Sequence, residues 1–88
     1  MNMEAGRLKL EECKQELQII ADLFYQNKIE DGVNKLPDLI RILNKIMEQE
    51  CYEDKSKFLD ILKNVTECID SKNYIMLADI IVFELLAA

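Results

Sequence analysis

Acidic side chains are the most numerous groups in this sequence that could take part in chemistry, and their spacing argues against a catalytic pair. Asp79 and Glu84 lie five residues apart within an apolar stretch. On a helix this spacing separates two side chains by about 140° around the axis, so the carboxylates do not converge on one substrate. If Asp79 is buried, its pKa should be raised; if it is exposed, it should cap a helix or pair with a lysine.

A second group of acids lies in the segment from residue 48 to residue 57, and comprises Glu48, Glu50, Glu53 and Asp54. A calcium loop needs regularly spaced oxygen ligands and a glycine turn, and this segment has neither. The sequence also contains no histidine, so the usual general base and the commonest metal ligand are both absent. We therefore expect a solvated charge run here, and a chain that is not an enzyme and holds no cofactor or metal.

The three cysteines, Cys13, Cys51 and Cys68, form no metal-binding or redox motif. Their number is odd, and no two are close enough for a CxxC or zinc spacing. Cys13 and Cys68 fall within helical apolar patterns, so we expect buried reduced thiols that pack as small hydrophobes, with a redox pair as the alternative. Reduced thiols point to the cytoplasm.

The overall charge and hydropathy narrow the range of partners. With 17 acids against 11 bases the net charge is −6, which disfavours nucleic acid as a ligand. Residues 1–10 carry charges and no apolar core of a secretory signal. The most apolar stretch, residues 74–86, contains two acids and is shorter than the roughly 20 residues that span a bilayer. These features predict no membrane span and favour another protein, or a second copy of this chain, as the partner.

Apolar residues recur at helical spacing along the chain, which has only 2 glycines and 1 proline. The pattern predicts one helical domain over residues 1–88, with helices at about 8–26, 28–49, 55–70 and 74–86. Asn27 is expected to cap the second helix. Pro37 lies inside that helix and either kinks it or starts a new helix after a short turn near Lys35; the unbroken periodicity favours a kink or a close continuation.

Each predicted helix has a stripe of residues expected to face the core. The first stripe is Leu10, Cys13, Leu17, Ile20 and Phe24, and the third is Phe58, Leu62, Val65 and Ile69. In the second helix the main stripe is Ile29, Val33, Leu36, Ile40, Leu43 and Met47, beside a side stripe of Leu39, Ile42 and Ile46. This side stripe either widens the core face, which we favour, or forms a milder version of an exposed apolar strip. Helices 8–26 and 28–49 share a weak repeat with helices 55–70 and 74–86. We therefore predict a four-helix antiparallel bundle of two helical hairpins, or two hairpins that complete their cores by dimerising.

The last helix differs from an ordinary surface helix because it has no polar face. Its bundle-facing side is predicted to hold Tyr74, Ala78, Ile81 and Leu85. Met76, Ile80 and Phe83 lie on the opposite side, with Asp79 beside them. Either neighbouring helices wrap this helix, or these four residues form an exposed partner or dimer interface. The short chain favours the exposed interface.

Two stretches resemble known helical proteins. Residues 72–85, KNYIMLADIIVFEL, contain Ala78-Asp79 and Glu84-Leu85 pairs after a short turn, and residues 26–36, QNKIEDGVNKL, form a similar first turn. This pattern resembles small uncharacterised bacterial helical domains, and the general layout is similar to flagellar export chaperones, which hold an apolar helix of their client. The resemblance covers about half of the chain, and it implies a helical bundle with a chaperone or adaptor role. This chain is shorter than a typical export chaperone, which bears on whether it has the client groove.

Three functional hypotheses follow. The first is a non-enzymatic protein-interaction module, adaptor or chaperone-like, that uses the apolar side of the last helix. The alternative is a structural homodimer in which the same residues serve only self-association. A small enzyme is the third and is disfavoured, because no set of convergent polar groups is evident. The final residues Leu86-Ala87-Ala88 resemble a tail that marks bacterial proteins for proteolysis, or they are simply the last helical turn.

Overall fold

The computed structural model describes residues 10–49, 52 and 54–86, and every regular element in these ranges is a helix. The all-α class predicted from the periodicity is therefore confirmed. In chain order the elements are α1 (Glu11–Tyr25), α2 (Ile29–Asn34), α3 (Leu36–Glu48), α4 (Lys55–Ser71), α5 (Tyr74–Ile80) and a π-helix, η1 (Ile81–Leu86).

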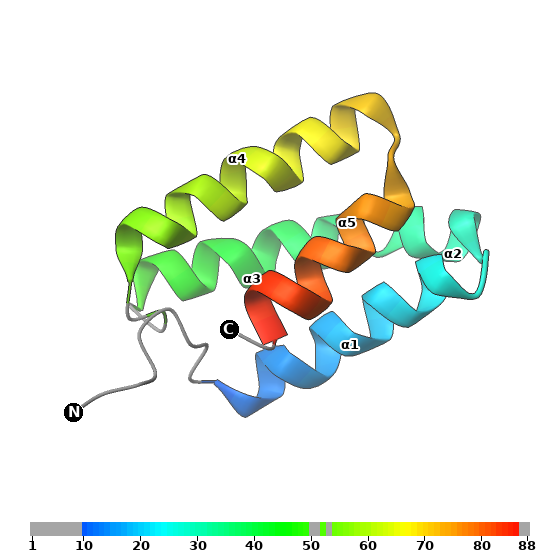
Figure 1. The fold of residues 1–88 in the computed structure, drawn as a ribbon. Coiled ribbons are helices and arrows are strands. Elements are labelled where there is room, and N and C mark those ends of the chain that lie inside the picture. The colour runs from blue at the N-terminus through cyan, green and yellow to red at the C-terminus, as the bar shows by residue number, and fades with distance from the viewer. Residues whose placement is uncertain (1–9, 50–51, 53, 87–88) are drawn as a thin grey trace.

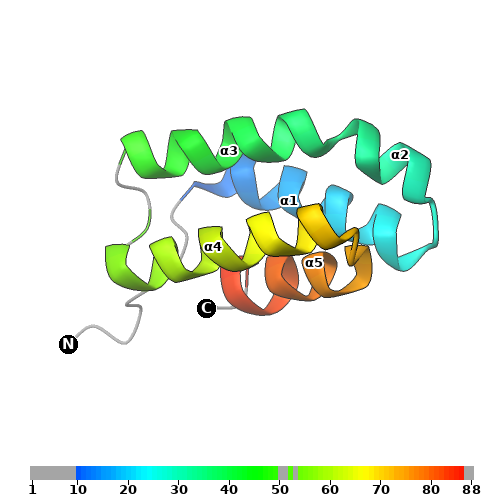
Figure 2. The same cartoon turned by 90° about the horizontal axis from the view of Figure 1, so that it is seen from above.

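The last α-helix, α5, packs against both α1 and α4 and so connects the two ends of the described chain (Figures 1 and 2). Its continuation η1 also packs against α1, and the helices α2 and α3 both contact α1. The first helix is thus covered largely by elements from the other end of the sequence. No helix in the described ranges is long and apolar enough to cross a membrane.

The stripe predicted for the first helix faces the core. Cys13, Leu17, Ile20 and Phe24 are buried, and Leu10 is half-buried against them. In α4 the buried face is centred slightly differently from the prediction: Leu62 and Ile69 are half-buried, and the fully buried residues are Phe58, Ile61, Val65 and Cys68. The side chain of Asp54 caps this helix by accepting a hydrogen bond from the Lys57 N–H at 3.1 Å.

Around Pro37 the chain forms two helices rather than one kinked helix. The first, α2, ends at Asn34, and α3 begins at Leu36, with Lys35 between them. Proline is well placed in the first turn of α3, where a backbone N–H would have no partner within the helix. The break lies where the sequence analysis placed its second alternative, near Lys35.

The core face of α3 includes the side stripe, as predicted, and Leu43 of the main stripe is buried with it. Ile40 and Met47, from the predicted main stripe, are 45% and 38% exposed, whereas Leu39, Ile42 and Ile46 are all fully buried. The prediction that Ile40 and Met47 face the core was wrong because it assumed one continuous helical periodicity on both sides of Lys35. The interruption resets that phase, so the core face of α3 cannot be extrapolated from α2.

The connection between α1 and α2 contains a residue in the left-handed region of backbone conformation. Asn27, with φ of 63°, ends the α1–α2 connection, and the residue that caps α2 is Lys28, without a side-chain hydrogen bond. The predicted Asn27 cap was therefore wrong; asparagine is used here because it tolerates this backbone conformation.

Gly32 in α2 lies against the Phe24 ring, and an ideal Cβ on Gly32 would be 2.7 Å from Phe24 Cδ1. A larger residue at this position would therefore clash with the ring.

The helix predicted over residues 74–86 is α-helical only as far as Ile80, and its remainder is the π-helix η1. Within η1 the Glu84 carbonyl accepts a hydrogen bond from the Tyr52 hydroxyl at 3.2 Å. Such tertiary contacts are not contained in residue periodicity, and a π-turn has no sequence signal of its own. The expectations that concern residues 1–9, Glu50, Cys51, Glu53, Ala87 and Ala88 lie outside the described residues.

Candidate protein-interaction site

The outer side of α5 and η1 carries the apolar residues that the sequence analysis singled out. Met76 is 52% exposed and Phe83 is 65% exposed, while Ile80 is half-buried. We call Met76, Ile80 and Phe83 the α5 strip. The residues on the inner side, Leu77, Ala78, Ile81 and Leu85, are all buried. Within the described chain α5 is therefore packed on its inner side and open on its outer side.

The sequence analysis missed two features of this helix. Ile75 is 50% exposed and lies beside Met76, so it widens the apolar surface. Tyr74, assigned to the inner side, is only half-buried, and its ring stacks on Phe24 with centroids 5.1 Å apart and an interplanar angle of 4°. Leu77, which was not in the predicted inner stripe, is fully buried next to Ala78.

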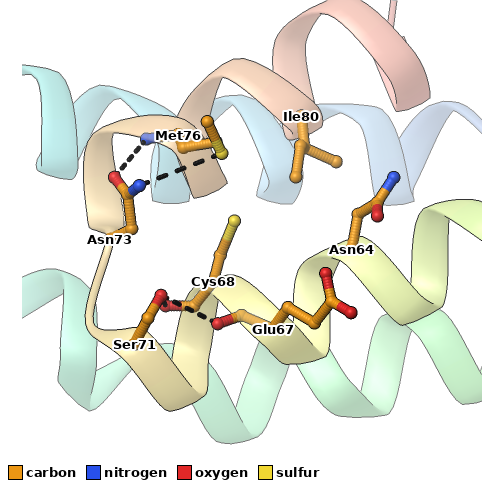
Figure 3. A pocket seen from close by; sticks show the side chains of 7 residues that line it. All are labelled: Asn64, Glu67, Cys68, Ser71, Asn73, Met76 and Ile80. Atoms are coloured by element: carbon orange, nitrogen blue, oxygen red, sulfur yellow. Dashed lines mark hydrogen bonds between the residues drawn. The ribbon is translucent and has the colours of Figure 1, made fainter.

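Between α4 and α5 a groove with a volume of about 420 Å³ opens beside the α5 strip (Figure 3). We call it the α4–α5 groove, and its lining residues are Asn64, Glu67, Cys68, Ser71, Asn73, Met76 and Ile80. Met76 and Ile80 come from α5, and the side chains of Asn64, Glu67 and Cys68 approach them from α4 (Figure 3). The groove thus has apolar side chains at its base and amide, hydroxyl and carboxylate groups at its rim.

Asn73 fixes the first turn of α5 and with it the position of Met76. Its side-chain oxygen accepts a hydrogen bond from the Met76 N–H at 3.3 Å, the usual role of an asparagine at a helix start. Its amide nitrogen lies 3.9 Å from the Met76 sulfur (Figure 3). The preceding residue, Lys72, adopts φ of 59°, which ends α4 and turns the chain sharply into α5. This short connection brings the two helices together at the closed end of the groove.

Asp79, which was predicted to lie at the partner interface, makes a hydrogen bond within the domain. Its carboxylate accepts a hydrogen bond from the Tyr25 hydroxyl at the end of α1, and it does not line the α4–α5 groove. This hydrogen bond, with smaller effects of burial and of the Asp79 charge, raises the pKa of Tyr25 to about 12. Asp79 therefore joins α5 to α1, while Met76 and Ile80 face α4.

Cys68 is buried at the base of the groove and is a poor nucleophile. Burial raises the pKa of its thiol, and the nearby Glu67 charge adds to the effect. A thiol with a raised pKa stays protonated at neutral pH, and the protonated form does not attack electrophiles. Cys13 is likewise buried as a thiol, so both described cysteines serve as small packing residues.

A second apolar groove, of about 260 Å³, lies between α3 and α4 and was not predicted. It is lined by Ile46, Met47, Tyr52, Lys55, Phe58 and Leu59. Tyr52 belongs to the segment expected to be solvated, yet it is 3% exposed and its ring lies 5.2 Å from that of Phe58. Burial, and then the charges of Glu84 and Asp54, raise the pKa of Tyr52. An aromatic residue within an otherwise acidic run was the signal that could have revealed it.

Within the described residues no three acidic or cysteine side chains lie close enough together to hold a metal ion. Two of the four clustered acids, Glu48 and Asp54, fall in these residues, and Asp54 is used as a helix cap. The groups that line the α4–α5 groove include one carboxylate, one buried thiol and two amides.

The fold and this site define a small all-α domain with an apolar strip and an adjoining groove on its last α-helix. The chain belongs to the family of the domain of unknown function DUF8042, whose family model matches residues 8–88. No curated protein and no solved structure matches the chain.

Proposed function

We propose that this chain is a non-enzymatic, cytoplasmic protein-interaction module, of adaptor or chaperone type, that binds another protein through the α5 strip. The observation that carries the proposal is the exposure of Met76 and Phe83, seven residues apart on one side of a helix whose opposite side is buried. Apolar side chains grouped in this way on a small domain are typical of a surface that another protein covers.

The neighbours of the strip also support the proposal. Exposed Ile75 and half-buried Ile80 and Val82 lie next to Met76 and Phe83, so the apolar surface is continuous along the helix. Methionine adapts its shape to different partners more readily than branched residues do. The buried thiols of Cys13 and Cys68 suit the cytoplasm, where cysteines stay reduced.

The scaffold that we propose for this function is a four-helix antiparallel bundle of two hairpins, with α2 and α3 together serving as one helix. In such a bundle the last helix is the one that returns beside the first, as the packing of α5 on α1 suggests. The general layout of the sequence, which is similar to that of flagellar export chaperones, agrees with a role in holding an apolar client helix.

The alternative is a homodimer in which a second copy covers the strip. A strip of this kind can pair with itself about a twofold axis, and a domain of 88 residues gains stability by doing so. The experiment below separates the two.

The test places a photo-crosslinking side chain on the strip in living cells. Phe83 is replaced by p-benzoylphenylalanine, which keeps an exposed aromatic group at that position. The matched control carries the same group at Ile40, which is 45% exposed on α3. After irradiation, adducts are separated by mass and identified by mass spectrometry.

A specific adduct with one other protein from position 83, absent from position 40, supports the proposal. An adduct of twice 10.3 kDa alone establishes the homodimer in its place. The same set of adducts from both positions, or none from position 83, contradicts the proposal, because the strip would then be no more reactive than an ordinary surface residue.

A further inference from the structure

We infer that the α4–α5 groove binds one amphipathic helix of a partner protein, and that this helix carries a lysine or arginine beside its apolar stripe to face Glu67. The inference rests on the proposed function and deepens it by naming the chemistry of the partner. Its experiment uses purified components, so it can fail while the proposed function stands.

The dimensions of the groove fit a short length of helix. On α4 its lining residues run from Asn64 to Ser71, and on α5 from Asn73 to Ile80. Eight helical residues extend about 12 Å, which is a little over two turns. Phe83 continues the apolar surface by a further turn beyond Ile80. A partner helix that lies in the groove would therefore use apolar residues at positions i, i+3 or i+4, and i+7.

The base of the groove supplies the apolar contacts for such a stripe. Met76 and Ile80 form one wall, and Cys68 lies at the base (Figure 3). The Met76 side chain projects from a turn that Asn73 already caps, so its backbone is fixed before a partner binds. The rim carries the side-chain amides of Asn64 and Asn73, which can hydrogen-bond to polar residues that flank the stripe.

The charge at the rim of the groove favours a partner helix with basic residues on one flank. Glu67 is the one charged residue that lines the groove, and no lysine or arginine in the described residues lies within 4.0 Å of its carboxylate. Asp60 lies seven residues before Glu67 on the same side of α4, with Lys63 between them, so Glu67 is the acid that faces the groove. A cation on the partner would therefore meet an unpaired carboxylate beside an apolar contact, where water is partly excluded.

The same charges disfavour a second copy of this chain in the groove. Each copy has a net charge of −6, and its outer α5 surface offers no lysine or arginine between Tyr74 and Leu86. Two like-charged molecules approach each other less readily than molecules of opposite charge. A separate partner with a basic amphipathic helix is the better match.

The test titrates the full chain into a fluorescein-labelled synthetic peptide and follows its anisotropy. The peptide has about 16 residues, enough to form a helix on binding, with leucines at i, i+3, i+4 and i+7 and lysines on one flank. A second peptide has glutamate in place of each lysine. We expect the lysine peptide to bind with micromolar Kd and the glutamate peptide to bind at least about tenfold more weakly.

Two variants with the same change in charge locate the effect. Glu67→Lys should weaken binding of the lysine peptide by roughly five- to tenfold, because it puts a like charge at the rim. Glu30→Lys alters an exposed acid on α2, away from the groove, and should leave Kd within about twofold of the wild type. In ¹⁵N spectra the side-chain amide signals of Asn64 and Asn73 should shift on binding, and that of Asn44 on α3 should not.

Equal weakening by Glu67→Lys and Glu30→Lys would overturn the inference, because binding would then follow net charge alone. Absence of binding by the lysine peptide, or shifts at Asn44 without shifts at Asn64 and Asn73, would overturn it as well. If position 83 crosslinks to another protein in cells and these results fail, the proposed function survives and the basic helix in the groove does not.

Discussion

Two helices of this domain each expose a pair of apolar residues seven positions apart, and the two pairs differ in what surrounds them. On α3 the pair is Ile40 and Met47, and on α5 with η1 it is Met76 and Phe83. Around Ile40 and Met47 lie the charged residues Arg41 and Lys45, which reach across to acids on α1. Around Met76 and Phe83 lie the apolar residues Ile75, Ile80 and Val82, and Asp79 beside them is hydrogen-bonded to Tyr25.

The comparison teaches that exposure of single apolar residues does not mark a site. Arg41 pairs with Glu16 at 3.3 Å and Lys45 with Glu12 at 3.9 Å, and Met47 lines the groove between α3 and α4. Ile40 and Met47 are therefore two separate apolar spots beside paired charges. Such spots are common on any domain. No ion pair in the described residues involves α5 or η1, and we propose the α5 strip as the partner surface for this reason.

The buried faces of the two helices should contribute equally to stability, and substitutions there should have the largest effect on the free energy of unfolding. Ile42 on α3 and Ile81 on η1 are both fully buried. Replacing either by alanine should lower the free energy of unfolding by about 2–5 kcal/mol, from lost burial and a residual cavity. Urea denaturation followed by circular dichroism measures it. A cost below about 1 kcal/mol for Ile81→Ala alone would mean that η1 is not an integral part of the core.

The outer faces should differ in binding and not in stability. Phe83→Asp and Ile40→Asp each change an exposed residue, so each should alter the free energy of unfolding by less than about 0.5 kcal/mol. With the crosslinker placed at Met76, Phe83→Asp should reduce the adduct at least about tenfold, as loss of a central aromatic contact does, and Ile40→Asp should not. Equal effects of the two variants would remove the distinction between the two surfaces.

The Tyr25–Asp79 hydrogen bond is a polar link between α5 and α1, and it should have an intermediate effect. Tyr25→Phe removes the donor and should lower the free energy of unfolding by about 0.5–1.5 kcal/mol. The control is Tyr25→Phe combined with Asp79→Asn. If the bond is responsible, adding the second change should cost less than Asp79→Asn costs in the wild-type chain.

The same bond predicts a dependence on pH. Because the pKa of Tyr25 is raised from 10.0 to about 12 in the folded protein, folding favours the protonated phenol. Its contribution to stability is complete below pH 10.0, declines as the pH rises above that value, and is lost above about pH 12. An ultraviolet absorbance titration should show Tyr25 ionising near pH 12, and this step should move toward pH 10.0 in Asp79→Asn. The raised pKa of Tyr52, which does not depend on Asp79, should stay unchanged in that variant.

The ion pairs that join α3 to α1 should have the smallest effect. Arg41 and Glu16 are about half exposed, so water and salt screen their attraction. Arg41→Gln should change the free energy of unfolding by less than about 0.5 kcal/mol, and the difference should vanish at high salt. A loss above about 1 kcal/mol would show that this pair contributes to folding.

The sequence predicted the features that depend on an uninterrupted helical phase. The buried stripe of α1 and the exposed Met76 and Phe83 follow from spacing alone, because each lies within a continuous helix or close to its end. The face of α3 could not be predicted in the same way, since one residue, Lys35, breaks the phase between α2 and α3. Leu39, Ile42 and Ile46 were predicted to widen the core face and are buried, whereas Ile40 and Met47 were predicted to be buried and are exposed.

Features that join distant parts of the chain could not be derived from periodicity. Asp79 was placed on the partner interface because of its position on the helix, and its hydrogen bond with Tyr25 connects residues 54 positions apart. The groove needs Asn64 and Glu67 from α4, which the sequence analysis did not single out. Tyr52 was treated as part of a polar segment, and its burial depends on Phe58 and on the carbonyl of Glu84.

The stacking of Phe24 on Tyr74 has a consequence for how the protein is made. The two rings belong to α1 and α5, so this contact cannot form until the ribosome has synthesised almost the entire described chain. Until then the apolar face of α1, with Leu17, Ile20 and Phe24, lacks its main cover from α5 and η1. A nascent chain arrested before residue 74 should therefore be readily cleaved by proteases within α1, and release of the last helix should end that sensitivity.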